Sequence, residues 1–198
     1  MGKLYLIMGK SATGKDTLYR DIVSRFTDVL GTVVPYTTRP RRAGESEGVE
    51  YHFITEDYMN ELEADGRIIE RRCYQTVYGP WYYLTADDGQ ISLNRGSSIL
   101  IVTPEAYVKL RSFFGEDRVV PLYVEVDDGV RLERALSRER KQEHPQYEEM
   151  CRRFLADAAD FSEEKLCELG IQKRYVNDVY ERVLEELCDT ISKGEQLC

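Results

Sequence analysis

The chain has 198 residues, of which 42% are hydrophobic, and its 36 acidic and 27 basic side chains give a formal net charge of −9. This length suits one domain of ordinary size with room for inserted subdomains and a substantial core. The negative charge argues against a nucleic-acid polymer as partner, because the molecule as a whole would repel phosphate backbones. No run approaches the ~20 apolar residues that cross a bilayer, and residues 1–3 lead directly into a strand rather than a signal peptide, so we expect a soluble protein with no membrane partner.

The cysteines are odd in number and widely separated, without a Cys-x-x-Cys pair. They are Cys73, Cys151, Cys167, Cys188 and Cys198. This usage is typical of reduced thiols in a cytoplasmic protein and argues against disulfides or a zinc site.

A phosphate-binding loop is predicted near the start of the chain. Residues 3–8 form an apolar run typical of a buried strand, and Leu18, Ile22 and Phe26 then recur at helical spacing. Between them, residues 9–15 read Gly-Lys-Ser-Ala-Thr-Gly-Lys. Glycines at this spacing let consecutive N–H groups surround an anion at a helix start, and Lys15 can reach the outer phosphates. The alternative, a glycine turn with a surface lysine, is disfavoured by the flanking strand and helix.

The next block, residues 35–90, predicts a small insertion with a mixed sheet. It opens with turn and basic residues at 35–45, after a short strand at 32–34. Its predicted elements are a half-buried strand at 49–53, a helix at 56–65 ended by Gly66, and strands at 68–70, 73–78 and 81–85, with a turn at 78–80.

The chain then resumes the alternation of strands and helices expected of a parallel sheet. The predicted elements are strands at 98–102 and 119–126 around a helix at 104–114, a charged helix from Gly129, a break at 138–145, a helix at 147–167, a strand at 174–176 and a helix at 178–192. In the last helix Val179, Val183, Leu184 and Leu187 share one face.

Arginines gather at residues 39–42 and 131–153 although the chain is acidic. Such local clusters favour binding of small, highly charged phosphates, and the alternative is a solvated face with ion pairs.

These motifs together resemble those of guanylate kinases, in order and spacing from residue 4 to about 187. The most specific is Thr37-Thr38-Arg39 followed by Arg42-Ala43-Gly44-Glu45; the others are the phosphate loop, Tyr51, Glu70 and Tyr78-Gly79. The resemblance implies an α/β fold: a P-loop NTPase three-layer core with a five-stranded parallel sheet, formed by residues 1–34 and 91–198. It also implies an inserted GMP-binding subdomain at 35–90 and a mobile helical lid at about 136–152.

The resemblance further implies roles for matching residues. ATP with Mg²⁺ is expected on Ser11, Ala12, Thr13, Gly14, Lys15, Asp16, Thr17 and Asn177. The acceptor is expected on Arg39, Arg42, Tyr51, Glu70 and Tyr78. The expected catalytic residues are Lys15, Arg39, Arg134, Arg138 and Arg153, whereas Arg131, Arg140 and Arg152 are assigned to ion pairs or solvent.

The chemistry of these side chains suits the roles. Guanidinium forks and tyrosine hydroxyls can hold a phosphate dianion, and the Glu70 carboxylate can accept from guanine N1–H and the 2-amino group. Taken singly, the residues have other readings: each tyrosine could pack in the core, Glu70 could be a solvated charge at a strand end, and Asn177 could cap a helix.

The sequence departs from the family pattern in the phosphate loop, where Asp16 replaces the hydroxyl residue that usually follows the lysine. Residues 99–103 read Ile-Leu-Ile-Val-Thr in place of a strand end with two aspartates, Pro80 replaces a serine or threonine, and Pro35-Tyr36 replaces a serine-rich segment. We therefore hypothesise that the metal anchor has moved, so that Asp16 holds Mg²⁺, directly or through water, with help from Thr17.

Three functions remain open. The first is an ATP-dependent nucleoside-monophosphate kinase that makes GDP from GMP by in-line transfer, acting as a monomer or homodimer. The second is a kinase for another small phosphorylated acceptor, since Gly14-Lys15-Asp16 also resembles the loop of ribose bisphosphate phosphokinases. The third is a non-catalytic module that binds a protein. Lys15 and the arginines of the lid region, Arg134, Arg138 and Arg153 (the lid arginines), argue against it.

Overall fold

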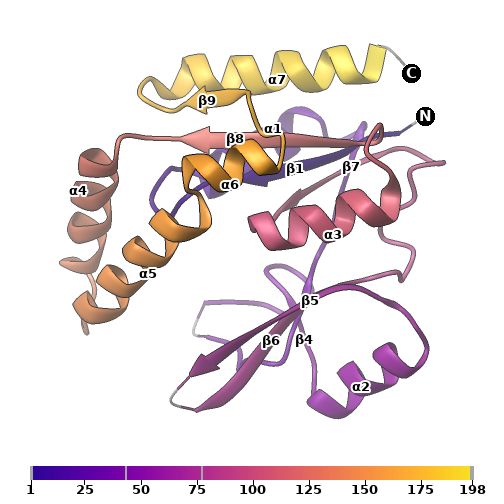
Figure 1. Cartoon of the computed structure of the whole chain (residues 1–198), viewed down its shortest axis with the longest axis horizontal. Helices are drawn as coiled ribbons and strands as arrows, with labels where there is room; N and C mark the ends of the chain where they lie inside the picture. Colours follow the sequence, from indigo (N-terminus) through magenta and orange to yellow (C-terminus); the bar gives the residue numbers. More distant parts are fainter. Residues whose placement is uncertain (1, 43, 77, 197–198) are drawn as a thin grey trace.

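The computed structural model describes residues 2–42, 44–76 and 78–196, which form two sheets and the helices around them (Figure 1). The strands are β1 Leu4–Met8, β2 Leu30–Thr32, β3 Tyr36–Thr37, β4 His52–Phe53, β5 Ile68–Thr76, β6 Gly79–Ala86, β7 Ser97–Ile101, β8 Val119–Glu125 and β9 Arg174–Val176. The helices are α1 Lys15–Arg25, α2 Glu56–Ala64, α3 Pro104–Phe114, α4 Asp128–Glu139, α5 Tyr147–Asp160, α6 Glu163–Glu168 and α7 Tyr180–Gln196.

The larger sheet has five parallel strands in the order β2-β7-β1-β8-β9. All five residues of β1 are buried, as expected for a central strand covered on both faces. Successive side chains alternate between the faces, so Leu6 packs with residues of α3 and α6, and Ile7 packs with residues of α1 and α7. Figure 1 shows α7 and α3 on opposite sides of this sheet.

The smaller sheet is mixed, with the order β4-β3-β6-β5. Its β5–β6 hairpin is antiparallel, whereas β3 and β4 pair in parallel. Met59 and Leu62 of α2 pack against Leu84 and Ala86 in a separate small core. The two sheets confirm the predicted fold class, while the boundaries at residues 34 and 91 and the lid remain predictions.

Several predicted elements differ in extent from the structure. The strand expected at 32–34 is β2 at Leu30–Thr32. In the segment 49–53 the first two residues form a turn, Tyr51 makes an isolated bridge with Glu47, and only His52–Phe53 form a strand. Residues 68–70 and 73–76 belong to one strand, β5, which contains a register shift between Ile68 and Glu70. Residue 77, within the predicted strand 73–78, lies outside the described residues.

The predicted helix at 147–167 is interrupted. Phe161 is 6% exposed and packs in the core, and the Ser162 hydroxyl then accepts from the Lys165 N–H to cap α6. A core contact and a new cap therefore end one helix and start another. The last helix was predicted to carry Val179, Val183, Leu184 and Leu187 on one face. This is wrong for Val179, which precedes α7 and is 50% exposed, whereas the other three are buried.

The four cysteines in the described part of the chain are free, with Cys188 buried and the other three exposed. Cys198 lies outside that part. Across residues 2–42, 44–76 and 78–196, no helix combines the length and apolar character needed to span a bilayer.

Candidate active site

The phosphate loop connects β1 to α1 at the carboxyl edge of the parallel sheet. Gly9 passes so close to β8 that an added Cβ would lie 2.5 Å from the Val124 carbonyl oxygen, and Gly14 has a φ of +84°. Ala12 also adopts a left-handed φ of 63°, uncommon for a residue with a Cβ. The glycines thus stand where the loop needs a close approach or a positive φ, as the motif predicts.

The start of α1 points toward an anion-binding position. Its N-cap residue, Gly14, supplies no side chain to the helix, so the first N–H groups remain available to a ligand. The Lys15 ammonium lies 3.6 Å from an Asp16 oxygen, and the Asp16 side chain is 76% exposed. Loop, helix and lysine together form a site suited to phosphate.

A cavity of about 720 Å³ opens beside this loop, a size typical of ligand sites. It is bounded by the loop, α4, α5 and the segment that leads into α7. Its lining residues are Ala12, Gly14, Asp16, Thr17, Arg134, Arg138, Arg153, Asn177, Asp178 and Tyr180. Eight of these ten were predicted as donor-site or catalytic residues, and only Asp178 and Tyr180 were not.

The three arginines predicted for the lid region reach this cavity from two helices. Arg134 and Arg138 lie one turn apart on α4, on the same face. An Arg134 Nη donates to the Asn177 carbonyl oxygen at 3.5 Å, and an Arg153 Nη donates to the Ser11 hydroxyl at 3.1 Å. The structure thus places a concentration of positive charge over the phosphate loop.

Asn177 stabilises the phosphate loop through a side-chain hydrogen bond. Its side chain is buried, with 4% of the residue exposed, and its amide donates to the Thr13 carbonyl oxygen at 2.7 Å. Thr13, itself buried, donates its hydroxyl to the Lys10 carbonyl oxygen. Since Asp178 and Val179 separate Asn177 from α7, the alternative of an ordinary cap for that helix is wrong.

On the mixed sheet, Arg39 is held in a buried cluster. It is 3% exposed, donates to both Glu45 carboxylate oxygens at 2.6 and 2.7 Å, and lies 5.0 Å from the Tyr51 ring centroid. The hydrogen bonds from Arg39 lower the pKa of Glu45 to about 2. Arg42 is exposed, and its backbone N–H also donates to Glu45.

The two predicted acceptor tyrosines have different environments. The Tyr51 ring makes edge contacts with Phe53 and Tyr83, and burial raises the pKa of its hydroxyl. Tyr78 is 83% exposed near the tip of the β5–β6 hairpin, where its ring stacks on Trp81. The structure therefore groups Tyr51 with Arg39 and leaves Tyr78 on the surface.

Glu70 is paired inside the protein. It is 3% exposed and accepts from Arg72 at 2.9 and 3.2 Å and from the Thr85 hydroxyl at 2.8 Å. Arg72 also donates to the Thr103 hydroxyl at 3.3 Å, across to the start of α3. The alternative of a solvated strand-end charge is wrong. Arg72 was not predicted, although alternation in a strand places residues 70 and 72 on one face.

Sequence reasoning also missed two residues at the phosphate loop. Arg131 was assigned to an ion pair or solvent; it is ion-paired but only 1% exposed, and it contacts Ser11 and Asp157. Asp157 received no role, yet it accepts from the Ser11 N–H. Arg140 is exposed and Arg152 pairs with Glu149 on the surface, as predicted.

A parallel sheet whose first strand ends in this loop, with arginines facing it across a cavity, defines a P-loop nucleotide-binding protein. A family model described as guanylate kinase matches residues 1–191. The chain therefore belongs to the guanylate kinase family.

Individual relatives support this assignment over parts of the chain. A guanylate kinase of Syntrophotalea carbinolica is 35% identical over 50% of this chain and 46% of its own length, and one of Schizosaccharomyces pombe is 38% identical over 39% of each. The chain thus spans about half or less of the length of these relatives. A crystal structure of guanylate kinase from Anaplasma phagocytophilum superposes with a TM-score of 0.66 over 100% of this chain and 87% of that one, at 21% identity, and so shares the fold.

Proposed function

We propose that the chain transfers the γ-phosphoryl group of ATP to a nucleoside monophosphate, with GMP as acceptor and GDP as product. The observation that carries this proposal is the cavity in which the phosphate loop meets Arg134, Arg138 and Arg153. A module that only binds a protein has no use for such a concentration of charge around a phosphate site. Phosphoryl transfer requires it, because catalysis there consists mainly of positioning and charge neutralisation.

In this proposal the donor phosphates lie on residues 11–17. The N–H groups at the start of α1 and the Lys15 ammonium bind the β- and γ-phosphates. The lid arginines neutralise charge that shifts from the γ-phosphate toward the leaving oxygen. The acceptor phosphate needs no general base, because its oxygen is already a competent nucleophile.

The acceptor phosphate is assigned to the mixed sheet, around Arg39, Arg42 and Tyr51, with Tyr78 reaching it from the hairpin. Arg39 is buried and aligned by Glu45, so a phosphate oxygen would share an ordered guanidinium. Closure of the lid over both substrates would exclude water that otherwise hydrolyses ATP.

Magnesium fits the donor site through Asp16 and Thr17, which both line the cavity. Among the described residues no group of three or more His, Cys, Asp and Glu side chains could hold a metal by itself. Mg²⁺ commonly uses one or two carboxylates together with substrate phosphates, so one exposed carboxylate and a hydroxyl suffice as protein ligands. When bound, the ion would neutralise phosphate charge and fix the orientation of the donor.

One observation favours a second candidate. The Glu70 carboxylate already accepts from Arg72 and Thr85, so guanine would have to displace Arg72 or use the remaining acceptor capacity of the carboxylate. An acceptor that offers hydrogen-bond acceptors instead could bind Arg72 directly. A kinase for another small phosphorylated compound is therefore the alternative.

A coupled assay of ADP production with ATP and a panel of acceptors tests the proposal. The panel contains GMP, AMP, CMP, UMP and ribose 1,5-bisphosphate. Turnover with GMP at the highest kcat/KM supports the first candidate, and turnover with ribose bisphosphate alone supports the second. No turnover with any of them would refute the kinase assignment.

A further inference from the structure

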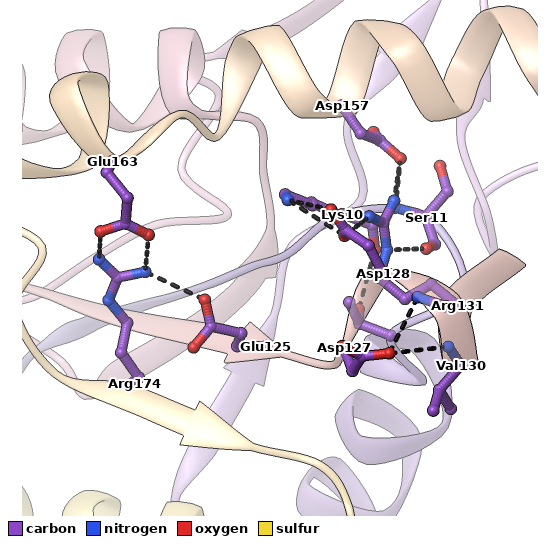
Figure 2. A network of polar contacts seen from close by, with 12 residues as sticks. Lys10, Ser11, Glu125, Asp127, Asp128, Val130, Arg131, Asp157, Glu163 and Arg174 are labelled. Carbon is purple, nitrogen blue, oxygen red and sulfur yellow. Dashed lines mark hydrogen bonds and ion pairs between the residues drawn. The ribbon is translucent and has the colours of Figure 1, made fainter.

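The backbone N–H and carbonyl groups of Ser11, in the phosphate loop, both form hydrogen bonds with side chains from α4 and α5 (Figure 2). The Ser11 N–H donates to Asp157 of α5 at 2.7 Å, and the Ser11 carbonyl oxygen accepts from Arg131 Nε of α4 at 2.9 Å. Arg131 and Asp157 are also bonded to each other at 2.9 Å. One residue of the loop is thus tied to two helices by a closed set of hydrogen bonds.

Arg131 is unusually well fixed for a charged residue. Its side chain is 1% exposed, its guanidinium lies 4.9 Å from the Phe154 ring centroid, and it also donates to Asp128. Lys10 of the loop contacts Asp128 at 3.2 Å. A buried charge is tolerated only when it is paired and hydrogen-bonded, so this guanidinium has one defined orientation.

The loop has a reason to need such support. Ala12, the next residue, has a φ of 63°. A left-handed conformation of a residue with a Cβ is unfavourable and persists only where its surroundings fix it. With Ser11 held on one side and Asn177 bonded to Thr13 on the other, Ala12 lies between two anchored positions.

Helical spacing connects these anchors to the lid arginines. Arg131, Arg134 and Arg138 are separated by three and four residues on α4, so they share a face. Arg153 and Asp157 are likewise one turn apart on α5. A contact that fixes Arg131 and Asp157 against the loop therefore also fixes the direction in which the other three arginines point.

We propose that Arg131 and Asp157 are positioning residues, which hold the phosphate loop and the lid arginines in register for the donor phosphates. This inference rests on the proposed function, because it assumes that ATP occupies the cavity. It assigns the pair no contact with substrate.

The test compares Arg131→Met, Arg131→Lys, Asp157→Asn and the Arg131→Met/Asp157→Asn double variant with the wild type. Arg25→Met and Asp160→Asn are matched controls, since both residues form ion pairs on exposed surface away from the donor cavity. For each protein, steady-state kinetics give kcat and the two KM values, calorimetry gives the Kd of MgATP, and thermal unfolding gives Tm. Arg131→Lys retains the charge and serves if the methionine variant does not fold.

We expect kcat/KM for ATP to fall by about tenfold or more in the Arg131 variants, the loss typical of a charge-assisted hydrogen bond, and the Kd of MgATP to rise. In the Arg131 and Asp157 variants, KM for GMP should stay within about twofold of the wild-type value. In the two control variants, all kinetic constants and the Kd of MgATP should stay within about twofold, the size of effect typical of a changed surface ion pair. Because the two residues act as a unit, the double variant should lose less than the product of the single losses.

A lower Tm with kinetics and MgATP affinity within twofold of wild type would overturn the inference, since the pair would then serve folding alone. If the wild type binds MgATP but turns over no acceptor, the proposed function fails and the calorimetric comparison decides the inference. A wild type that binds no MgATP would overturn both.

Discussion

Replacing Glu45 with glutamine should destabilise the protein in a pH-dependent way. Arg39 lowers the pKa of Glu45 from 4.5 to about 2, and each unit of a pKa shift corresponds to about 1.36 kcal/mol. The ion pair therefore contributes at most about 3 kcal/mol at pH 7, and screening by solvent at the Glu45 side chain reduces this to roughly 2 kcal/mol. The Glu45→Gln variant should unfold more easily by that amount.

The sign of the pH dependence follows from the direction of the shift. Since the folded-state pKa lies below the unfolded value of 4.5, the contribution is complete above pH 4.5, decreases as the pH falls toward 2, and is absent below 2. Urea unfolding of wild type and variant at pH 7, 4 and 3 measures it. The difference in the free energy of unfolding between wild type and Glu45→Gln should become smaller from pH 7 to pH 4 and again from pH 4 to pH 3.

Glu63→Gln is the control, because Glu63 pairs with Arg71 on an exposed surface and should change stability by no more than about 0.5 kcal/mol. A Glu45→Gln difference in unfolding free energy that stays constant from pH 7 to pH 3, or that is no larger than the control's, would show that this partly buried ion pair does not stabilise the fold.

Three further predictions concern the site. In Asp16→Asn, ATP affinity should depend less on Mg²⁺ than in the wild type. Without a metal, a carboxylate ~4 Å from a phosphate charge costs about 4 kcal/mol at an effective dielectric near 20. Equal wild-type ATP affinity with and without Mg²⁺, measured by calorimetry, would refute a role of Asp16 in holding the metal. Gly14→Ala should lower stability by roughly 1–3 kcal/mol, since the new Cβ would lie 2.7 Å from the Asn177 amide nitrogen at a φ of +84°; an unchanged urea midpoint would contradict this. Glu70→Gln should reduce kcat/KM for GMP by roughly tenfold and leave AMP turnover unaltered, whereas equal losses for both would show that Glu70 does not read the base.

The sequence contains enough local information to predict most of the core. Apolar runs and helical spacing placed β1, α1 and β8, because burial on both faces of a parallel sheet leaves a clear pattern. The phosphate loop could be predicted because its glycines stand where the backbone needs a positive φ, at Gly14, or a close approach to β8, at Gly9.

The pairing of charges could not be predicted in the same way. Ser11 and Asp157 are 146 residues apart. Helical spacing places Asp157 on the face of α5 that carries Phe154 and Phe161, unlike Asp160, but it does not show which distant group this face contacts. Arg131 lies in a helix, α4, whose many charged residues predict exposure to solvent. Its side chain is nevertheless buried against Phe154 and the phosphate loop. Arg72 could have been paired with Glu70 from strand alternation, although its contact with Thr103 depends on how the two sheets meet.

The central claim is that two phosphate sites, one on the loop after β1 and one around Arg39, face each other across a gap that can close. The most direct test is the binding of a compound that joins adenosine and guanosine through five phosphates, measured by calorimetry. We expect one molecule of this compound to bind per chain, far more tightly than ATP or GMP alone, and to exclude both. Binding no tighter than that of ATP, with GMP still able to bind beside the compound, would show that the two phosphate sites do not face each other.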